Sequence, residues 1–578
     1  MKRLLKYLSK YKAECVLAPL FKMLEATFEL FVPLVMAAII DRGIATGDLS
    51  YIGKMCLLLV LLAVIGLISA VTAQYFAAKA AVGFATNLRH AVFKHIQGLS
   101  YSELDSIGSS TLITRMTSDI NQAQSGVNMT LRLFLRSPFI VFGAMIMAFT
   151  VNAKEALIFA ATIPALSVVV FGIMVITMPM YKKVQSGLDG ILNRTTENLE
   201  GARVIRAFRK EKEETEHFNE ETDSLADMQR LVGRISGLMN PVTFIIVNAA
   251  TIALLYTGAF QVDKAVITQG ELVALVNYMS QILVELVKLA NLIITISKAL
   301  ACANRVADVL DIKTGLLDGT APLPEKKPGI PAVEFSHACL IYGKSTNSEA
   351  LSDISFKAMP GETIGIIGGT GAGKSSIVNL IPRFYDVSSG TVRVNGADVK
   401  SCRMADLRSK IGVVPQKAVL FHGSIAENLR WGNEGASVDE LNAALKAAQA
   451  YEFVTEKSGG LDFVISEGGK NLSGGQRQRL TIARALVRQP EILILDDSSS
   501  ALDFATDAAL RQAVSSLKNK MTVFIVSQRT SSIMHADKII VVDNGRITGT
   551  GTHEELLKSD VIYREIYESQ FKGNQKDE

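Results

Sequence analysis

The sequence predicts a chain in two parts: an α-helical portion that crosses a membrane six times, then an α/β domain with a mainly parallel sheet. Six apolar segments in the N-terminal half are each close to the ~20 residues that a helix needs to cross a bilayer. The C-terminal half alternates short β-branched apolar runs with helical stretches, which is typical of a parallel sheet covered by helices. The composition agrees, because 49% of the 578 residues are hydrophobic and the mean hydropathy is +0.27.

Residues 1–12 predict a short amphipathic helix on the cytoplasmic face of the membrane. The basic residues Lys2, Arg3, Lys6, Lys10 and Lys12 are interleaved with apolar residues that recur at helical spacing. A disordered tail is the alternative, and the helical spacing disfavours it. No small-residue cleavage site follows, so we expect no removed signal peptide.

The connections between the apolar segments are of two kinds. Residues 41–51, 152–155 and 263–271 are short and carry few lysines or arginines, whereas 81–127 and 180–240 are long and rich in both. By the positive-inside rule the long connections are cytoplasmic, and so are both termini. A soluble protein with apolar core helices is the alternative, and this charge asymmetry disfavours it. We expect the spans near residues 14–40, 54–80, 128–151, 155–179, 241–262 and 272–298.

Charged side chains inside two of these spans are costly in a bilayer and indicate a function or a pairing. Glu25 and Glu29 lie four residues apart on one face of the first span, and Glu285 and Lys288 lie three apart in the last. One interpretation is a water-filled cavity for cationic, amphipathic cargo, lined by Glu25, Glu29 and Glu285. The other is mutual pairing between helices, and the sequence does not choose between the two.

The net charge and the cysteines bear on the possible partners and on disulfide or metal sites. A net charge of +4 on a chain of this length says little about nucleic acid; we expect no nucleic-acid partner for a chain with fused membrane spans. The five cysteines are scattered without a C-x-x-C pair, which favours reduced or buried thiols over a disulfide framework or a metal site.

Residues 368–375 have the pattern G-x-x-x-x-G-K-S, a P-loop. The run 363–367 before it predicts a buried strand and 376–381 after it a helix, which is the context that the motif requires. A plain glycine turn is the alternative, and this context disfavours it. Backbone N–H groups would close around phosphates, Lys374 would reach the β- and γ-phosphates, and Ser375 would bind Mg²⁺. The expected ATP-binding residues here are Gly368, Gly369, Thr370, Gly371, Ala372, Gly373, Lys374, Ser375 and Ser376.

Two further motifs follow in order. Residues 492–497 form an apolar run that ends in carboxylates, a Walker B strand in which Asp496 would hold Mg²⁺. Before it lies Leu472-Ser473-Gly474-Gly475-Gln476, the LSGGQ signature of ATP-binding-cassette (ABC) proteins, and the chain resembles that family. The resemblance spans most of the C-terminal half. It extends to residues placed like the adenine-stacking aromatic, the Q-loop and the D-loop, namely Tyr342, Gln416 and 500–503.

The resemblance implies the architecture: an α-helical transmembrane domain of the ABC exporter type, with six helices, fused to an α/β P-loop ATP-binding cassette. We place the transmembrane domain, with long cytoplasmic helical extensions, at residues 1–312, a Gly- and Pro-rich linker at 313–332 and the nucleotide-binding domain at 333–578. In such exporters short coupling helices contact the cassettes. Residues 104–119 and 197–208 are similar to the two intracellular-loop patterns, with the second contact near 200–208.

In this family two chains build each ATP site: one supplies the P-loop, Walker B, Q-loop and switch, and the other supplies the signature. The resemblance therefore implies a second phosphate cradle, directed at the partner's nucleotide, formed by Ser473, Gly474, Gly475 and Gln476. The implied cofactors are ATP and Mg²⁺, with the metal held by Ser375, Gln416 and Asp496.

Two positions depart from the family pattern. Active cassettes have a glutamate after the Walker B aspartate as catalytic base, and here that residue is Asp497; the switch histidine is replaced by Gln528. With an intact signature, this resembles one subunit of the bacterial heterodimeric multidrug ABC exporters. We expect the catalytic positions Asp497, Gln528 and Gln416 to serve a site that binds ATP well and hydrolyses it weakly.

The expected protein is an ATP-driven exporter subunit in a bacterial plasma (inner) membrane. Its partner would be a second half-transporter that carries the catalytic glutamate and the switch histidine, and its cargo hydrophobic or cationic small molecules among membrane lipids. A lipid flippase or peptide exporter is the alternative, and an ATP-gated channel a further one. The fused membrane spans exclude a soluble ABC ATPase acting on DNA or ribosomes.

Overall fold

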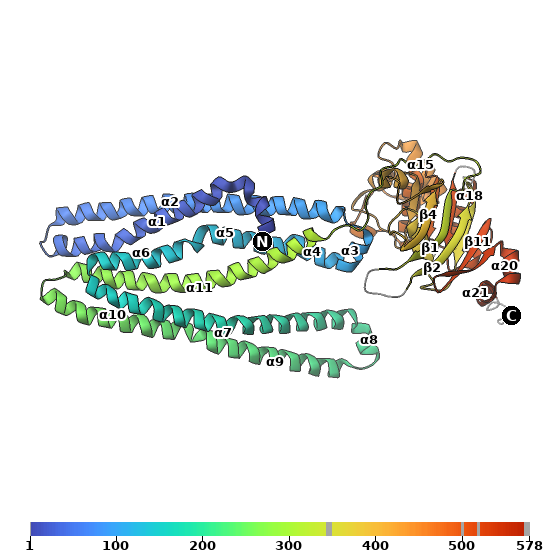
Figure 1. The fold of residues 1–578 in the computed structure, drawn as a ribbon. Helices are drawn as coiled ribbons and strands as arrows, with labels where there is room; N and C mark the ends of the chain where they lie inside the picture. The colour runs from blue at the N-terminus through green and yellow to red at the C-terminus, as the bar shows by residue number, and fades with distance from the viewer. Residues whose placement is uncertain (1, 343–348, 499–501, 517–520, 572–578) are drawn as a thin grey trace. The chain divides into compact units, whose positions relative to one another are not determined.

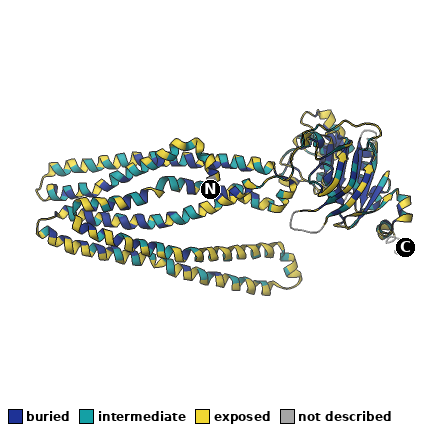
Figure 2. Ribbon diagram, viewed as in Figure 1, coloured by how far each residue is buried: buried dark blue, intermediate teal, exposed yellow. Residues whose placement is uncertain are grey.

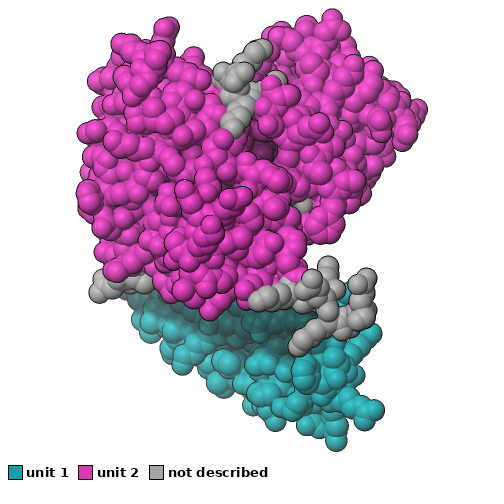
Figure 3. Space-filling model, turned by 90° about the vertical axis from the view of Figure 1, so that its right-hand side faces the viewer, with its two compact units in different colours: residues 1–97, 109–312 teal, residues 98–108, 313–578 magenta. Residues whose placement is uncertain are grey.

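The computed structural model describes residues 2–342, 349–498, 502–516 and 521–571. The chain divides into two compact units (Figure 3). The first comprises Met1–Gln97 and Ser109–Ile312, and the second comprises Gly98–Gly108 and Lys313–Glu578. The short stretch 98–108 thus groups by its contacts with the C-terminal unit, although the sequence-based boundaries assign it to the transmembrane domain.

The first unit is entirely helical where the structure describes it (Figure 1). Six of its helical stretches are long and apolar enough to cross a membrane: Arg3–Ile44, Leu49–Gln97, Ser109–Val151, Ala153–Glu200, Glu211–Asp263 and Gln269–Asp311. Each contains one expected span, so the prediction of six apolar helices is confirmed. The elements are η1 (Lys2–Tyr11), α1 (Lys12–Ala38), η2 (Ile39–Ile44), α2 (Leu49–Gln97), α4 (Ser109–Thr114), η3 (Arg115–Asp119), α5 (Ile120–Met129), η4 (Thr130–Phe134), α6 (Arg136–Val151), α7 (Ala153–Glu200), α8 (Ala202–Ala207), α9 (Glu211–Gly237), α10 (Met239–Asp263) and α11 (Gln269–Asp311).

The apolar side chains of this unit are sorted between an interior and an outer surface. Helices α1, α6, α7, α10 and α11 share a core in which Phe159, Leu166 and Tyr278 are fully buried. The exposed residues that run along the helices in Figure 2 include many large apolar ones on α2, such as Leu57 and Leu67. Exposed apolar surface of this extent is what contact with lipid tails requires.

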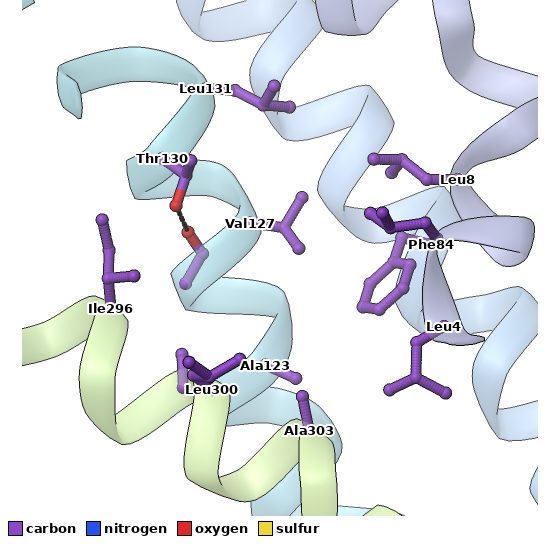
Figure 4. A pocket seen from close by; sticks show the side chains of 13 residues that line it. Leu4, Leu8, Phe84, Ala123, Val127, Thr130, Leu131, Ile296, Leu300 and Ala303 are labelled. Carbon is purple, nitrogen blue, oxygen red and sulfur yellow. Dashed lines mark hydrogen bonds between the residues drawn. The ribbon is translucent and has the colours of Figure 1, made fainter. Parts of the chain in front are cut away.

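The N-terminal segment η1 is amphipathic, in agreement with its sequence pattern, although it is a 3₁₀ helix. Leu4 is buried against Phe84 and its neighbours on α2, whereas Lys6 and Lys10 are exposed. Beneath η1 lies an apolar cavity of about 120 Å³, between Leu4, Leu8 and Phe84 on one side and α5 and α11 on the others (Figure 4). The hydroxyl of Thr130, its polar wall residue, donates to the carbonyl of Gly126 within the helix, so the lining stays apolar.

The second unit is built on a six-stranded sheet in the order β12-β11-β3-β10-β9-β6. Every pair in it is parallel except β11 with β12, so the predicted α/β domain with a mainly parallel core is confirmed. The central strands read as continuous apolar runs because helices cover both faces. The strands are β3 (Thr363–Ile367), β6 (Ile411–Val414), β9 (Ile492–Asp496), β10 (Thr522–Val526), β11 (Lys538–Asp543) and β12 (Arg546–Gly551).

A second, four-stranded sheet in the order β2-β1-β4-β5 is antiparallel, and the sequence patterns did not predict it as a separate layer. Its strands are β1 (Val333–Leu340), β2 (Leu351–Ala358), β4 (Ser389–Val394) and β5 (Ala397–Asp398), and a short pair joins β7 (Gly423–Ser424) to β8 (Val464–Ile465). The helical elements are α3 (Tyr101–Ile107), α12 (Lys374–Leu380), α13 (Met404–Ser409), α14 (Ile425–Arg430), α15 (Val438–Ala447), α16 (Tyr451–Glu456), η5 (Gly460–Asp462), η6 (Glu467–Gly469), α17 (Gly474–Val487), α18 (Phe504–Ser516), α19 (Thr530–Ile533), α20 (His553–Ser559) and α21 (Val561–Phe571).

Candidate nucleotide-binding site

The residues predicted from the sequence to bind nucleotide lie at one edge of the parallel sheet. Strands β6, β9, β10 and β3 are parallel neighbours, so their carboxyl ends lie together. The P-loop follows β3, Asp496 ends β9, Gln416 follows β6 and Gln528 follows β10. Ligands of α/β sheets bind beyond the carboxyl ends of the strands, and this edge therefore forms the candidate site.

The P-loop has the backbone geometry that only glycines adopt readily. Gly371 and Gly373 have φ of 81° and 101°, and a Cβ on Gly373 would lie 2.8 Å from the Leu351 side chain. Helix α12 begins at Lys374, whose Nζ donates to the carbonyl oxygens of Gly368 and Gly369 at 2.9 and 2.6 Å. Burial lowers the pKa of the Lys374 ammonium, and a bound phosphate would offset that cost.

The candidate metal ligands are hard oxygen donors. The hydroxyl of Ser375 donates to the carboxylate of Asp496 at 2.9 Å, so a side chain from the P-loop and one from Walker B are already in contact. Burial raises the pKa of the Asp496 carboxyl, and the nearby charge of Asp497 raises it further. No cluster of three or more His, Cys, Asp or Glu side chains occurs in the described part of the chain. One carboxylate and one hydroxyl fit Mg²⁺, which binds through few protein ligands together with substrate phosphates.

Two of the three candidate catalytic positions, Asp497 and Gln416, lie beside this pair. Asp497 accepts a hydrogen bond from Gln416 Nε2 at 3.3 Å, and its backbone N–H donates to the carbonyl of Val526 at 2.9 Å. Its φ is 44°, a left-handed conformation that aspartate tolerates better than most residues. Gln528 is exposed at the end of β10. The structure thus brings Gln416 and Asp497 into direct contact next to Asp496.

Tyr342 lies against the helix that follows the P-loop. Its hydroxyl donates to Ser376 Oγ at 2.9 Å, and its ring packs edge-on against Tyr385 with 5.0 Å between centroids. Burial raises the pKa of the Tyr342 phenol. This placement agrees with an aromatic platform at the nucleotide end of the P-loop. Of the D-loop, residues 500 and 501 lie outside the described part of the chain.

The signature caps a helix at the surface. Ser473 is the N-cap of α17: its Oγ accepts from the N–H of Gln476 at 3.2 Å, and Gln476 Oε1 accepts from the N–H of Ser473 at 3.1 Å. Ser473 and Gly474 are exposed. A rigid helix N-terminus with exposed N–H groups is suited to phosphate, and here it is accessible to another chain.

Helix α3, which lies in the first long connection, contacts this region. Tyr101 lies over Phe384 with 4.7 Å between ring centroids, and the carboxylate of Asp105 accepts from the Tyr385 hydroxyl at 2.7 Å. Tyr385 also contacts Tyr342. The sequence pattern at 104–119 predicted a cassette contact here, but Tyr385 was missed, because nothing local marks it as a member of the site.

The three glutamates proposed for a cargo cavity are ion-paired. Arg136 on α6 donates to Glu285 on α11 and to Glu29 on α1, each at 2.6 Å, and Glu285 also accepts from Lys288 and Ser137. Glu25 pairs with Lys22. Arg136 was missed although it lies within the expected third span, where any charge is a signal. The contacts of Arg136 and Ser137 pair different helices, whereas Glu25 with Lys22 and Glu285 with Lys288 are pairs within one helix; a role in cargo binding stays a prediction.

Residues 15–286 match the family described as ABC transporter transmembrane region, and residues 351–500 match the family described as ABC transporter. An uncharacterized ABC transporter ATP-binding protein of Mycobacterium tuberculosis is 36% identical over 98% of this chain and 97% of its own length. The chain belongs to the ABC transporter family. As a transmembrane region fused to one cassette, it is an ABC exporter half-transporter and a multi-pass membrane protein, and it carries the ATP-binding domain of a translocase.

Other relatives and one solved structure extend this result. The chain is similar to the ATP-binding protein YfiB of Bacillus subtilis, 34% identical over 99% of each chain. It is similar to the ATP-dependent lipid A-core flippase of Yersinia pestis, 29% identical over 99% of this chain and 97% of that one. Its fold matches the structure of a bacterial Atm1-family ABC exporter with ATP bound, with a TM-score of 0.79, 25% identity and coverage of 97% and 98%.

Proposed function

We propose that this half-transporter works in a heterodimeric exporter of drugs or amphipathic compounds, and that its own ATP site is degenerate. The observation that carries the proposal is Asp497 in the base position, in contact with Gln416, combined with Gln528 at the switch and an intact signature. A chain with a weak base and a good signature needs a partner with the complementary features.

At this chain's site each binding residue has a separate task. Lys374 neutralises phosphate charge, Ser375 and Asp496 hold Mg²⁺, and Tyr342 offers its ring to adenine. ATP supplies the γ-phosphate whose transfer to water drives the cycle. Because these binding residues are all in place, we infer tight nucleotide binding.

Hydrolysis is a different matter, because it needs a base within ~2.6–3.2 Å of the attacking water. The Asp497 side chain is one methylene shorter than glutamate, and a misplacement of about 1 Å can cost ~10²-fold in rate. Gln528 can donate a hydrogen bond to phosphate but lacks the positive charge of a protonated histidine. The site therefore holds ATP and turns it over slowly.

Two exposed surfaces favour a dimer. Ser473 and Gly474 are accessible on α17, as the signature of a shared site must be. Around α8, the apolar side chains of Leu199, Val204 and Phe208 are 74%, 60% and 73% exposed. Since α8 lies in the second intracellular-loop pattern, we infer that it docks on the partner's cassette.

The cargo class has a second candidate, a lipid. Relatives named ATP-dependent lipid A-core flippase match nearly the whole chain, and drugs and lipids share an amphipathic character. We place the chain in a bacterial plasma membrane with both termini cytoplasmic, because the long connections carry the lysines and arginines.

The test is the ATPase activity of the purified chain with and without its partner in lipid nanodiscs. We expect little hydrolysis from this chain alone and substrate-stimulated hydrolysis from the assembled pair, assayed across drugs and lipids. Brisk ATPase activity from this chain alone, comparable to that of an active transporter, would refute the degenerate site and remove the need for a different partner.

A further inference from the structure

The C-terminal helix α21 reaches the switch segment through one side chain. Gln570 Nε2 donates to the backbone carbonyl of Gln528 at 2.7 Å. Gln570 Oε1 accepts from the backbone N–H and the hydroxyl of Thr530 at 2.9 and 2.8 Å. One amide therefore bonds to the backbone on both sides of Arg529, immediately after β10.

The orientation of this amide is fixed by its partners. Exchanging its oxygen and nitrogen would set carbonyl against carbonyl at Gln528 and N–H against N–H at Thr530. Thr530 is also the first residue of α19, where the N–H groups have no partner within the helix. Gln570 supplies that missing acceptor from a different helix.

Helix α21 is anchored well enough to act as a support. Tyr563 is fully buried, its hydroxyl lies 2.7 Å from His553 Nδ1, and its N–H donates to Asp560 at 2.8 Å. Ile566 packs on the same core. Tyr563, Ile566 and Gln570 are three and seven residues apart, so they share one face of the helix. The burial of Tyr563 and Ile566 thus sets where Gln570 is held.

The rest of the switch segment is held from other sides. The N–H of Ser527 donates to the carbonyl of Ile366 on β3 at 3.1 Å, and the N–H of Arg529 donates to Ser527 Oγ at 2.9 Å. The carbonyl of Gln528 is held by Gln570, while the Gln528 side chain is exposed. The backbone of the switch is therefore fixed, and its side chain projects from a fixed point.

We propose that Gln570 is a positioning residue that holds the peptide of Gln528 so that its side chain meets the γ-phosphate of ATP at this chain's site. The proposal rests on the role given to Gln528 under the proposed function. It assigns to the C-terminal helix a part in distinguishing ATP from ADP, because only ATP has the phosphate that Gln528 would contact.

The experiment measures equilibrium binding of the non-hydrolysable analogue β,γ-imido-ATP and of ADP, both with Mg²⁺, to the full chain in nanodiscs. Gln570→Ala should weaken binding of the analogue by about 3- to 10-fold, the loss of one hydrogen bond to phosphate, and leave ADP binding within about twofold. Ser569→Ala is the matched control, because its hydroxyl bonds only to Ile566 of its own helix, and it should change neither affinity.

Gln570→Glu separates positioning from general support. The carboxylate still accepts from Thr530 but sets an oxygen against the Gln528 carbonyl, so we expect the same selective loss in a chain that stays folded at the assay temperature. If Gln570→Ala melts below the assay temperature, this variant decides the question by itself.

A double-mutant cycle tests whether Gln570 acts through Gln528. Gln528→Ala should itself weaken binding of the analogue, and adding Gln570→Ala should then cause no further loss. Additive losses, equal losses of both nucleotides, or no loss in either Gln570 variant would overturn the proposal. The proposed function fails separately: its refutation is brisk ATPase from the wild-type chain, and failure of Gln528→Ala to affect the analogue would show that the switch role is wrong.

Discussion

Arg136 forms ion pairs with glutamates on two other helices, and replacing it with methionine should destabilise the first unit. Arg136 donates at 2.6 Å to both Glu29 and Glu285, and Glu285 is only 3% exposed. Removing one partner of a buried ion pair costs ~3–5 kcal/mol, since the other charge is left uncompensated. Glu285 keeps Lys288 and Ser137, so we expect the lower end, about 3 kcal/mol.

The assay is thermal unfolding of the chain in nanodiscs, where each kcal/mol corresponds to a shift of about 1–2 °C in the melting temperature of a unit of about 300 residues. Arg132→Met is the matched control, because Arg132 is less buried and donates to the neutral amide of Gln74. Combining Arg136→Met with Glu285→Gln should restore about 1–3 kcal/mol through coupling, since the uncompensated carboxylate is gone.

A different result would support the cargo interpretation of these glutamates. If Arg136→Met melts like the wild type, the ion pairs do not hold the helices together. If the combined change Glu25→Gln and Glu29→Gln then lowers transport of cationic compounds more than of neutral ones, these carboxylates bind cargo. Equal losses for both cargo types would favour a structural pair.

Three further outcomes are expected. In the assembled pair, Asp497→Asn should lower steady-state ATPase activity only modestly, because the base is already misplaced. Ser473→Ala should lower it severely, because this signature completes the partner's site. Equally severe losses in the two variants would make Asp497 a working base. Lys374→Ala should weaken ATP binding at this site by ~1.5–3 kcal/mol, because a charge-assisted contact is lost. Tyr342→Ala should weaken it by about 1–3 kcal/mol, because stacking on adenine is lost. Unchanged binding of labelled nucleotide in both variants would contradict these assignments. Tyr385→Phe removes the hydrogen bond to Asp105 on α3, so the amount of cargo transported per ATP hydrolysed should fall, while nucleotide affinity stays within about twofold. An unchanged amount of cargo per ATP would show that this bond does not couple ATP hydrolysis to transport.

Much of the fold could be predicted because its signals are local. Residues 363–367 are apolar and β-branched and are followed at once by glycines, and β3 has these bounds. The long apolar spans are equally plain, since length and hydropathy alone identify them. The antiparallel sheet could not be predicted in this way. In β1, which pairs with β2 and β4, buried residues alternate irregularly with half-buried ones, as they do in many surface strands.

The parts of the site that the sequence did not predict depend on contacts between distant positions. Arg136 meets Glu285 across 149 residues, and Gln570 meets Gln528 across 42. Gln570 looks locally like an ordinary polar residue on a helix, whereas the charge of Arg136 inside a span is a local signal that does not identify its partner. Tyr385 meets Asp105 across 280 residues, and only the folded chain places its ring beside Tyr342. Motifs reveal residues that bind phosphate, whereas the side chains that position them leave no such mark.

The grouping of residues 98–108 with the second unit has a consequence for how the cassette is tethered. The chain passes between the units three times, near residues 97, 109 and 312. After a protease cut in the linker, the cassette would therefore be held only by its non-covalent contacts with α3, which lies between α2 and α4 in the chain. Conversely, a cassette produced from residue 333 onward would lack α3, and the rings of Phe384 and Tyr385 would lose their cover from Tyr101. Nucleotide affinities measured on such a fragment would describe a site whose aromatic contacts are incomplete.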